Sequence, residues 1–231
     1  MEIDKNLFIK GLLITMLLFL VVLSLNITIN SRREDVLIDK MDSVVQEYED
    51  MQALMFMSEF FGEEATCIAL QSMLYELNKG LWDLGLKIDL YRQAREEFMQ
   101  DPFYIQQKKE FNRKEVLYFS MLRKMKEMCK INQTIVSFFY RRKDFCLDCD
   151  AQSFVLSDIK HDLTKLGEDE ELPVFSFDAD MGIPAINLLI KFYNITQYPC
   201  MIIGDKKHCG LYNKKDTLNI ICSHGKNPLC E

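Results

Sequence analysis

The residues best suited to chemistry in this chain are Cys146 and Cys149, which stand two residues apart in the stretch "DFCLDCD". Thiol–disulfide exchange needs one thiolate that attacks and a second thiol that resolves the mixed disulfide. Two intervening residues let both sulfurs meet in the first turn of a helix, where unpaired amides and the helix dipole favour a thiolate. We therefore predict Cys146 as an exposed nucleophile and Cys149 as a more buried resolving thiol.

Charged residues of both signs surround this pair. Basic residues at positions 141–143 would stabilise a thiolate, whereas Asp144, Asp148 and Asp150 would raise its pKa. This balance predicts a disulfide reductase, an isomerase or a modest oxidase rather than a strong oxidant. The exchange itself needs only the two thiols, and we expect no cofactor.

Two other roles for these cysteines compete with exchange. The first is a structural disulfide between Cys146 and Cys149. The second is a zinc site that combines them with Cys200, Cys209 and His208. The spacing disfavours zinc, because Cys200 and Cys209 are farther apart than the two to four residues typical of such sites.

The elements around the pair are predicted from a change in periodicity after residue 132. The run "TIVSFFY" is β-branched, aromatic and continuously apolar, which is typical of a strand buried on both faces. The later segments alternate between strand and helix patterns. We predict strands at 134–140, 172–180, 198–204 and 207–212, and helices at 150–166, 183–195 and 214–222.

Over residues 133–222 the chain resembles the thioredoxin superfamily. The Cys-x-x-Cys follows the first buried strand, and Tyr198-Pro199 stands just before the third strand, where that family keeps a cis-proline. The resemblance implies an α/β domain, a central mixed sheet flanked by helices, in which Pro199 and Tyr198 shape a groove for protein substrates. The chain departs from the family in its Leu-Asp dipeptide and in its first strand, which lacks the buried acid of thioredoxins.

The remaining cysteines suit an oxidising compartment, since the chain has eight in all. Cys67 and Cys129 lie on apolar seams at similar distances from a turn near position 100, so we hypothesise a disulfide between them; two free thiols are the alternative. Across the last predicted strand pair, Cys200 pairs with Cys209 or acts as a third redox thiol. A pair of Cys222 with Cys230 would tie the C-terminal tail to the last helix.

The middle of the chain, residues 31–131, is predicted to be helical. Apolar residues recur at steps of three and four from Leu37 to Met55, from Cys67 to Phe98, and from Phe111 to Cys129, as in a helical hairpin or coiled coil. The single tryptophan, Trp82, falls on the second of these helices, where we expect it to pack. The segment is interpreted as a spacer, a homo-oligomerisation surface or a platform for a partner.

The first 30 residues predict a membrane anchor. The stretch "GLLITMLLFLVVLSL" has no charged residue, and with its neighbours it reaches about 20 residues, one bilayer crossing. A cleaved signal peptide is the alternative, but no small-residue cleavage site follows. Together with the cysteines, this places the bulk of the chain outside the cytoplasmic membrane, anchored in lipid by one span. The net charge of −7 argues against nucleic acid as a partner.

These observations predict three parts: an anchor at 1–30, a helical segment at 31–131 and a thioredoxin-like domain at 132–231. The predicted function is that of an enzyme, a membrane-anchored thiol–disulfide oxidoreductase. It would act on the thiols and disulfides of extracytoplasmic proteins and exchange electrons with a membrane or soluble redox partner. The alternative is a non-catalytic, membrane-tethered interaction protein whose disulfides are structural.

Overall fold

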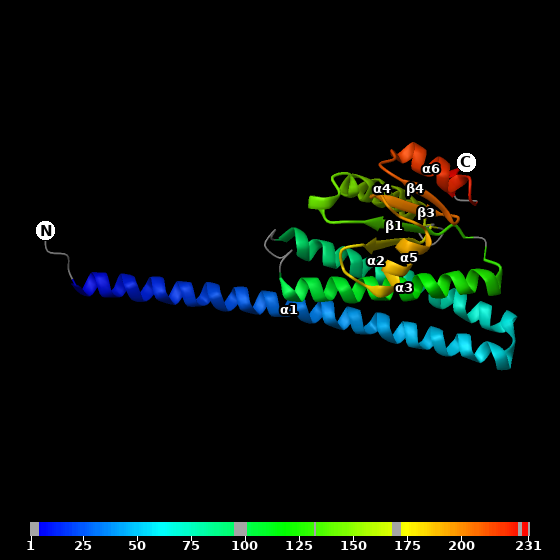
Figure 1. Ribbon diagram of the computed structural model, residues 1–231. Helices are drawn as coiled ribbons and strands as arrows, with labels where there is room; N and C mark the ends of the chain where they lie inside the picture. Colours follow the sequence, from blue (N-terminus) through cyan, green and yellow to red (C-terminus); the bar gives the residue numbers. More distant parts are fainter. Residues whose placement is uncertain (1–4, 95–100, 132, 168–171, 226–227, 231) are drawn as a thin grey trace. The chain divides into compact units, whose positions relative to one another are not determined.

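The computed structural model describes residues 5–94, 101–131, 133–167, 172–225 and 228–230. It is mostly helical and contains a small mixed sheet (Figure 1). The chain divides into two compact units, residues 1–43 and 44–231. The division into three parts made from the sequence stays a prediction.

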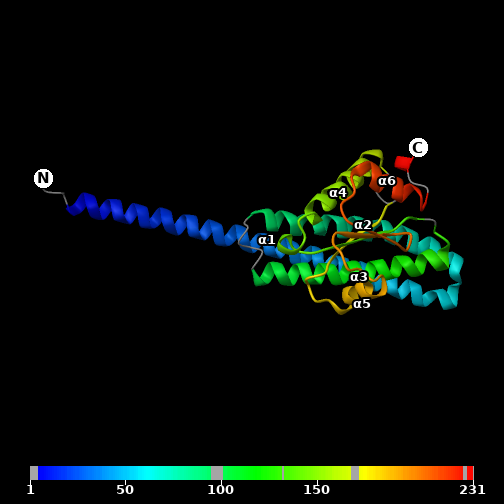
Figure 2. The ribbon, with the colours of Figure 1, turned by 45° about the horizontal axis from the view of Figure 1, so that its top comes forward.

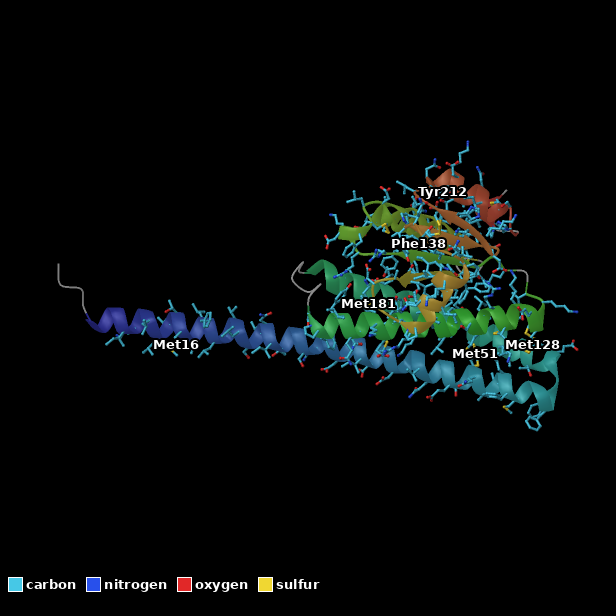
Figure 3. The ribbon with its side chains drawn as sticks, in the orientation of Figure 1. Met16, Met51, Met128, Phe138, Met181 and Tyr212 are labelled. Atoms are coloured by element: carbon cyan, nitrogen blue, oxygen red, sulfur yellow. A yellow bond between two sulfur atoms is a disulfide. The ribbon has the colours of Figure 1, made fainter. Side chains whose placement is uncertain are left out.

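The first helix, α1 (Lys5–Phe61), is continuous through the predicted boundary at residue 30. Its continuity follows from the sequence, because no glycine or proline occurs between Gly11 and Gly62. Gly62 then ends the helix with a positive φ of 86°. Within α1, Ile9–Thr28 has the length and composition of a membrane span or a signal sequence. The apolar side chains of this stretch project outward around the helix, Met16 among them (Figure 3).

Two further helices form an antiparallel hairpin. Helix α2 (Glu63–Ala94) runs beside α3 (Pro102–Cys129) in both Figure 1 and Figure 2. As expected from the turn signal, Asp101 caps α3 and accepts a hydrogen bond from the amide of Phe103 at 3.0 Å. The predicted seams are buried, with Leu70, Leu74, Leu77, Leu81, Leu84 and Ile88 on α2 and Tyr118, Leu122 and Met125 on α3. Phe98, the predicted end of the second seam, lies outside the described residues.

The sheet has four strands in the order β2-β1-β3-β4. Strand β1 (Val136–Tyr140) pairs in parallel with β2 (Val174–Asp178) and antiparallel with β3 (Cys200–Ile203), which pairs antiparallel with β4 (Lys206–Cys209). A short 3-10 turn, η2 (Lys143–Phe145), follows β1, and a second, η4 (Pro228–Cys230), ends the described chain. The helices between and after the strands are α4 (Cys149–Leu166), α5 (Pro184–Phe192) and α6 (Lys214–Cys222). The predicted order of elements in this part of the chain is confirmed.

Alternating residues of the strands supply two cores. On the face toward α4 and α6, apolar side chains pack as one cluster, which contains Val136, Phe138, Leu156, Ile159, Leu163, Met201, Ile203 and Ile221. On the other face Phe175 makes edge-to-face contacts with Tyr118 and Phe119 of α3, with ring centroids 5.2 and 5.5 Å apart. Helix α3 therefore takes part in the same core as the sheet.

Helix α3 also covers the open edge of the sheet at β2. The Oε1 atom of Glu115 accepts a hydrogen bond from the amide of Ser176, and the Oδ1 atom of Asn112 accepts one from the amide of Asp178, both at 2.9 Å. Edge strands expose amides that can recruit other chains. Two side chains of α3 thus satisfy two outward amides of this edge and connect the helix to it.

Candidate functional site

The predicted redox pair lies where the sheet brings three segments together. The carboxyl ends of the parallel strands β1 and β2 lie at the same end of the sheet as the amino end of the antiparallel strand β3. Cys146 and Cys149 follow β1, and Tyr198-Pro199 precedes β3. Cys146 and Cys149 form a disulfide with their Cα atoms 5.4 Å apart.

The local geometry corrects one detail of the prediction. Cys146 does not lie in the first turn of the helix; it is extended, with φ −154° and ψ 97°, and follows the 3-10 turn η2. Helix α4 begins at Cys149, and Asp148 occupies the N-cap position without a side-chain hydrogen bond. Two residues, Leu147 and Asp148, therefore separate Cys146 from the start of the helix. The helix N-terminus therefore acts on Cys149 more directly than on Cys146.

Exposure also differs from the prediction for the nucleophile. Cys146 is 6% exposed and Cys149 is 2% exposed, so both cysteines are buried in the disulfide form. The residues beside Cys146 turn outward instead, since Leu147 is 84% exposed and Phe145 is 56% exposed. Two apolar side chains next to Cys146 in the sequence are therefore open to solvent.

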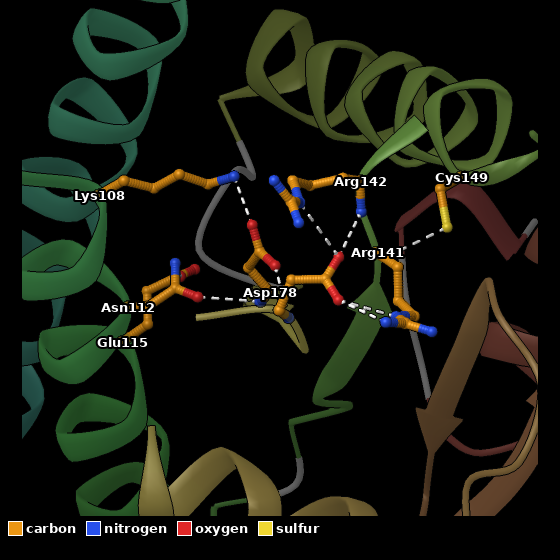
Figure 4. A network of polar contacts seen from close by, with 8 residues as sticks. Lys108, Asn112, Glu115, Arg141, Arg142, Cys149 and Asp178 are labelled. Carbon is orange, nitrogen blue, oxygen red and sulfur yellow. Dashed lines mark hydrogen bonds and ion pairs between the residues drawn. The ribbon is translucent and has the colours of Figure 1, made fainter. Parts of the chain in front are cut away.

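Arg141 contacts the disulfide through its backbone. Its amide donates to the Sγ atom of Cys149 at 3.5 Å (Figure 4). Its guanidinium lies 4.7 Å from the ring centroid of Phe145 and 5.9 Å from that of Tyr198. Arg141 thus connects the cysteines to the segment before β3.

Asp180 binds two of the three basic residues that were predicted to stabilise a thiolate, Arg141 and Arg142. Its carboxylate accepts hydrogen bonds from Arg141 Nε and from the Arg142 amide, both at 2.8 Å. Burial raises the pKa of Asp180, but these hydrogen bonds and the two guanidinium charges outweigh it and hold the pKa below its usual value. Asp180 was missed in the sequence because it follows β2, far along the chain from the cysteines.

A second ion pair lies deeper, next to the first. Asp178 is fully buried; it pairs with Lys108 of α3, and its Oδ1 atom accepts a hydrogen bond from the Asp180 amide at 2.9 Å (Figure 4). Burial lowers the pKa of Lys108, but the nearby Tyr140 and Asp178 raise it more, so the net shift is upward. A continuous set of contacts therefore runs from α3 through Asp178 and Asp180 to Arg141.

Two other groups of this region have displaced pKa values. Burial raises the pKa of Glu115 well above its usual value, although the Ser176 amide and Lys108 act in the opposite direction. Burial likewise raises the pKa of Tyr140. The first strand carries no acid, as the sequence indicated, but Asp178 and Glu115 place buried acids nearby from other elements.

Tyr198 and Pro199 adopt the arrangement expected from the sequence. The peptide bond between them is cis, and Pro199 is buried. The Pro199 carbonyl accepts a hydrogen bond from the Gly210 amide at 2.8 Å, which joins this segment to the end of β4. Their role in substrate binding stays a prediction.

The other six cysteines form three further disulfides. Cys67 joins Cys129 across the α2–α3 hairpin, Cys200 joins Cys209 across β3 and β4, and Cys222 joins Cys230. These pairings are the ones proposed from the sequence, and they leave no free cysteine. All four cysteines of the alternative zinc site are therefore bonded to sulfur. Within the described ranges, no group of three or more His, Cys, Asp or Glu side chains has metal-binding geometry.

Comparison of the chain with models of protein families, with curated proteins and with solved structures finds no match.

Proposed function

We propose that residues 132–231 form a thioredoxin-like domain and that it exchanges disulfides with other proteins through Cys146 and Cys149. The observation that carries the proposal is the disulfide itself, which lies between the carboxyl end of β1 and the start of α4. The strand order β2-β1-β3-β4, with only the first two strands parallel, is consistent with such a domain.

The exchange proceeds in two steps in the reducing direction. The thiolate of Cys146 attacks one sulfur of a client disulfide, so that a Cys146–client bond forms and the other client sulfur leaves as a thiolate. The thiolate of Cys149 then attacks Cys146, which forms the intramolecular disulfide and releases the second client thiolate. The Arg141 amide stabilises the charge on Cys149, because it donates to that sulfur. Run backwards, the same steps oxidise a client.

The surroundings of Cys146 stabilise its thiolate only weakly. The guanidinium of Arg141 and the amide of Arg142 bind the carboxylate of Asp180, so little positive charge is directed at Cys146. Asp144, Asp148 and Asp150 add negative charge around the cysteines. This arrangement supports a reductase, an isomerase or a modest oxidase.

The clients are proteins with accessible cysteines, and exposed Leu147 and Phe145 would contact their apolar side chains beside the reacting sulfur. The helix Ile9–Thr28 would hold the domain at the membrane, on the oxidising side, where eight cysteines remain paired. This location is part of the proposal.

Trapping of clients tests the proposed function. Cys149→Ser keeps the nucleophile and removes the resolving thiol, so it should accumulate mixed disulfides that a reductant releases. Cys146→Ser is the matched control and should accumulate at least tenfold less, because it lacks the proposed nucleophile. Mass spectrometry identifies the linked cysteines. Equal trapping by both variants, or none by either, would contradict the assignment.

A second candidate is a membrane-tethered interaction protein, and one observation favours it. The C-terminal end of α1 exposes three large aromatic side chains, Phe56, Phe60 and Phe61. Clustered exposed apolar side chains are typical of interaction sites. Under this function, partners would bind equally to the wild type and to Cys146→Ser/Cys149→Ser, and reductant would not release them.

A further inference from the structure

A cavity of about 320 Å³ lies beside the redox pair, between the α2–α3 hairpin and α4. Its floor is formed by β1 and β2, and Cys149 is part of its wall. This volume falls in the range of small-molecule sites. The cavity is separate from the surface at Leu147 and Phe145, because neither of these residues lines it.

Aromatic side chains dominate the walls. They come from every element around the cavity, and they are Trp82, Tyr104, Phe111, Tyr118, Phe138, Tyr140, Phe154 and Phe175. Small residues also line the cavity, with Gly85 on α2 and Ser153 and Ser157 on α4. A Cβ atom at Gly85 would stand only 3.2 Å from the ring of Phe111, so the absence of a side chain there lets that ring line the cavity. Flat aromatic walls suit a planar ring.

The charges of the lining favour a ligand without net charge. Lys108 is paired with Asp178, and burial raises the pKa of Glu115 well above its usual value, which favours its neutral form. The buried Lys160 donates a hydrogen bond to the Leu172 carbonyl at 3.2 Å, and Asp150, the other charged residue of the lining, is exposed at the start of α4. Residues that can donate hydrogen bonds also line the cavity, among them Lys108, Ser153, Ser157 and Tyr140. The lining therefore suits an uncharged planar ring that carries oxygen acceptors.

We propose that this cavity binds a quinone of one or two rings, which accepts electrons from the reduced Cys146–Cys149 pair. The inference rests on the proposed function and adds the electron acceptor to it. In the net step two S–H bonds break and the S–S bond forms, while the two carbonyl oxygens gain both protons and the ring gains two electrons, which gives the hydroquinone. A quinone in the cavity would contact the cysteine pair directly, because Cys149 is part of the cavity wall. A membrane anchor would also keep the domain where apolar quinones are concentrated.

Duroquinone is a suitable probe, since its ring carries four methyl groups and offers no open position for thiol addition. The full chain is held in lipid nanodiscs, and the fluorescence of Trp82, its only tryptophan, is titrated with the probe. Ser157→Tyr fills the cavity from an exposed helical position, and His161→Tyr is the matched control on the same helix, outside the lining. Circular dichroism verifies that both variants fold.

The wild type and His161→Tyr should show saturable quenching and, once reduced, rapid disulfide formation on addition of duroquinone. Ser157→Tyr should lose at least tenfold in both measurements, while oxidised glutathione should close the disulfide at equal rates in all three proteins. Equal rates with duroquinone in all three, or no saturable quenching in the wild type, would overturn the quinone site alone. If neither oxidant closes the disulfide, the proposed exchange function fails and the acceptor role fails with it.

Discussion

Two disulfides of this protein have the same chemistry and different surroundings. Cys67–Cys129 joins two long helices across 62 residues of sequence, among buried apolar seams. Cys146–Cys149 spans three residues, beside two ion pairs and an aromatic cavity. The first bond restricts a long stretch of chain, whereas the second restricts almost none. A disulfide that contributes little to stability and lies among polar groups is the one suited to opening and closing.

The largest predicted effect is the difference in unfolding free energy that the two disulfides contribute. Cys67→Ser/Cys129→Ser should lower the free energy of unfolding by about 4 kcal/mol, because it frees a long loop in the unfolded chain. Cys146→Ser/Cys149→Ser is the matched variant and should cost less than about 2 kcal/mol. Urea denaturation followed by Trp82 fluorescence measures both. Equal losses would contradict the division into a structural and a reactive bond.

The next effect is the loss of stability when the ion pair between Lys108 of the helical hairpin and Asp178 is broken. Lys108→Met leaves the fully buried Asp178 carboxylate without its cation and should cost about 3 kcal/mol of unfolding free energy. Arg123→Met removes a similar but exposed pair, with Asp205, and should cost about 1 kcal/mol or less. The same denaturation assay compares them. A loss for Lys108→Met no larger than for Arg123→Met would show that the hairpin does not depend on this contact.

The smallest effect is a pH dependence of stability caused by Glu115, which contacts the edge strand β2. The folded protein holds the proton of Glu115 to a higher pH than the unfolded chain does, because burial raises this pKa. Stability should therefore fall as the pH rises above about 4.5, the ordinary value for this carboxyl, toward the raised folded value.

Glu115→Gln should flatten this decline, because a glutamine side chain does not titrate. The exposed Glu110→Gln should leave the profile unchanged. Chemical denaturation at a series of pH values gives the slopes. A wild-type profile as flat as that of Glu115→Gln would exclude a protonated, buried Glu115.

The sequence predicted the elements well where a local pattern determines them. The seams of α2 and α3 are set by helical periodicity, and the short strands by continuous apolar runs. The turn signal at Asp101-Pro102 predicted both the start of α3 and the antiparallel arrangement that brings Cys67 to Cys129. These inferences need only neighbours within a few residues.

The polar network of the site could not be predicted in this way. Lys108 meets Asp178, and Arg141 meets Asp180, across long stretches of sequence. The first contact depends on how α3 packs on β2, and the second on the parallel pairing of β1 with β2. One signal was present: Lys108, Asn112 and Glu115 recur at helical spacing on α3, close to its apolar seam. Polar residues on a face that packs against a sheet edge indicate contacts with that edge. The position of Cys146 outside α4 was missed because a 3-10 turn has no clear sequence pattern.

A redox titration of the full chain tests the central claim most directly. Free thiols are alkylated at each potential, and mass spectrometry reads the state of every cysteine pair. The account predicts that Cys146 and Cys149 open and close together between roughly −120 and −270 mV, the range of exchange enzymes, while Cys67–Cys129 stays closed. If Cys146–Cys149 remains closed below about −300 mV, as structural disulfides do, then it is structural and the proposed exchange function is wrong.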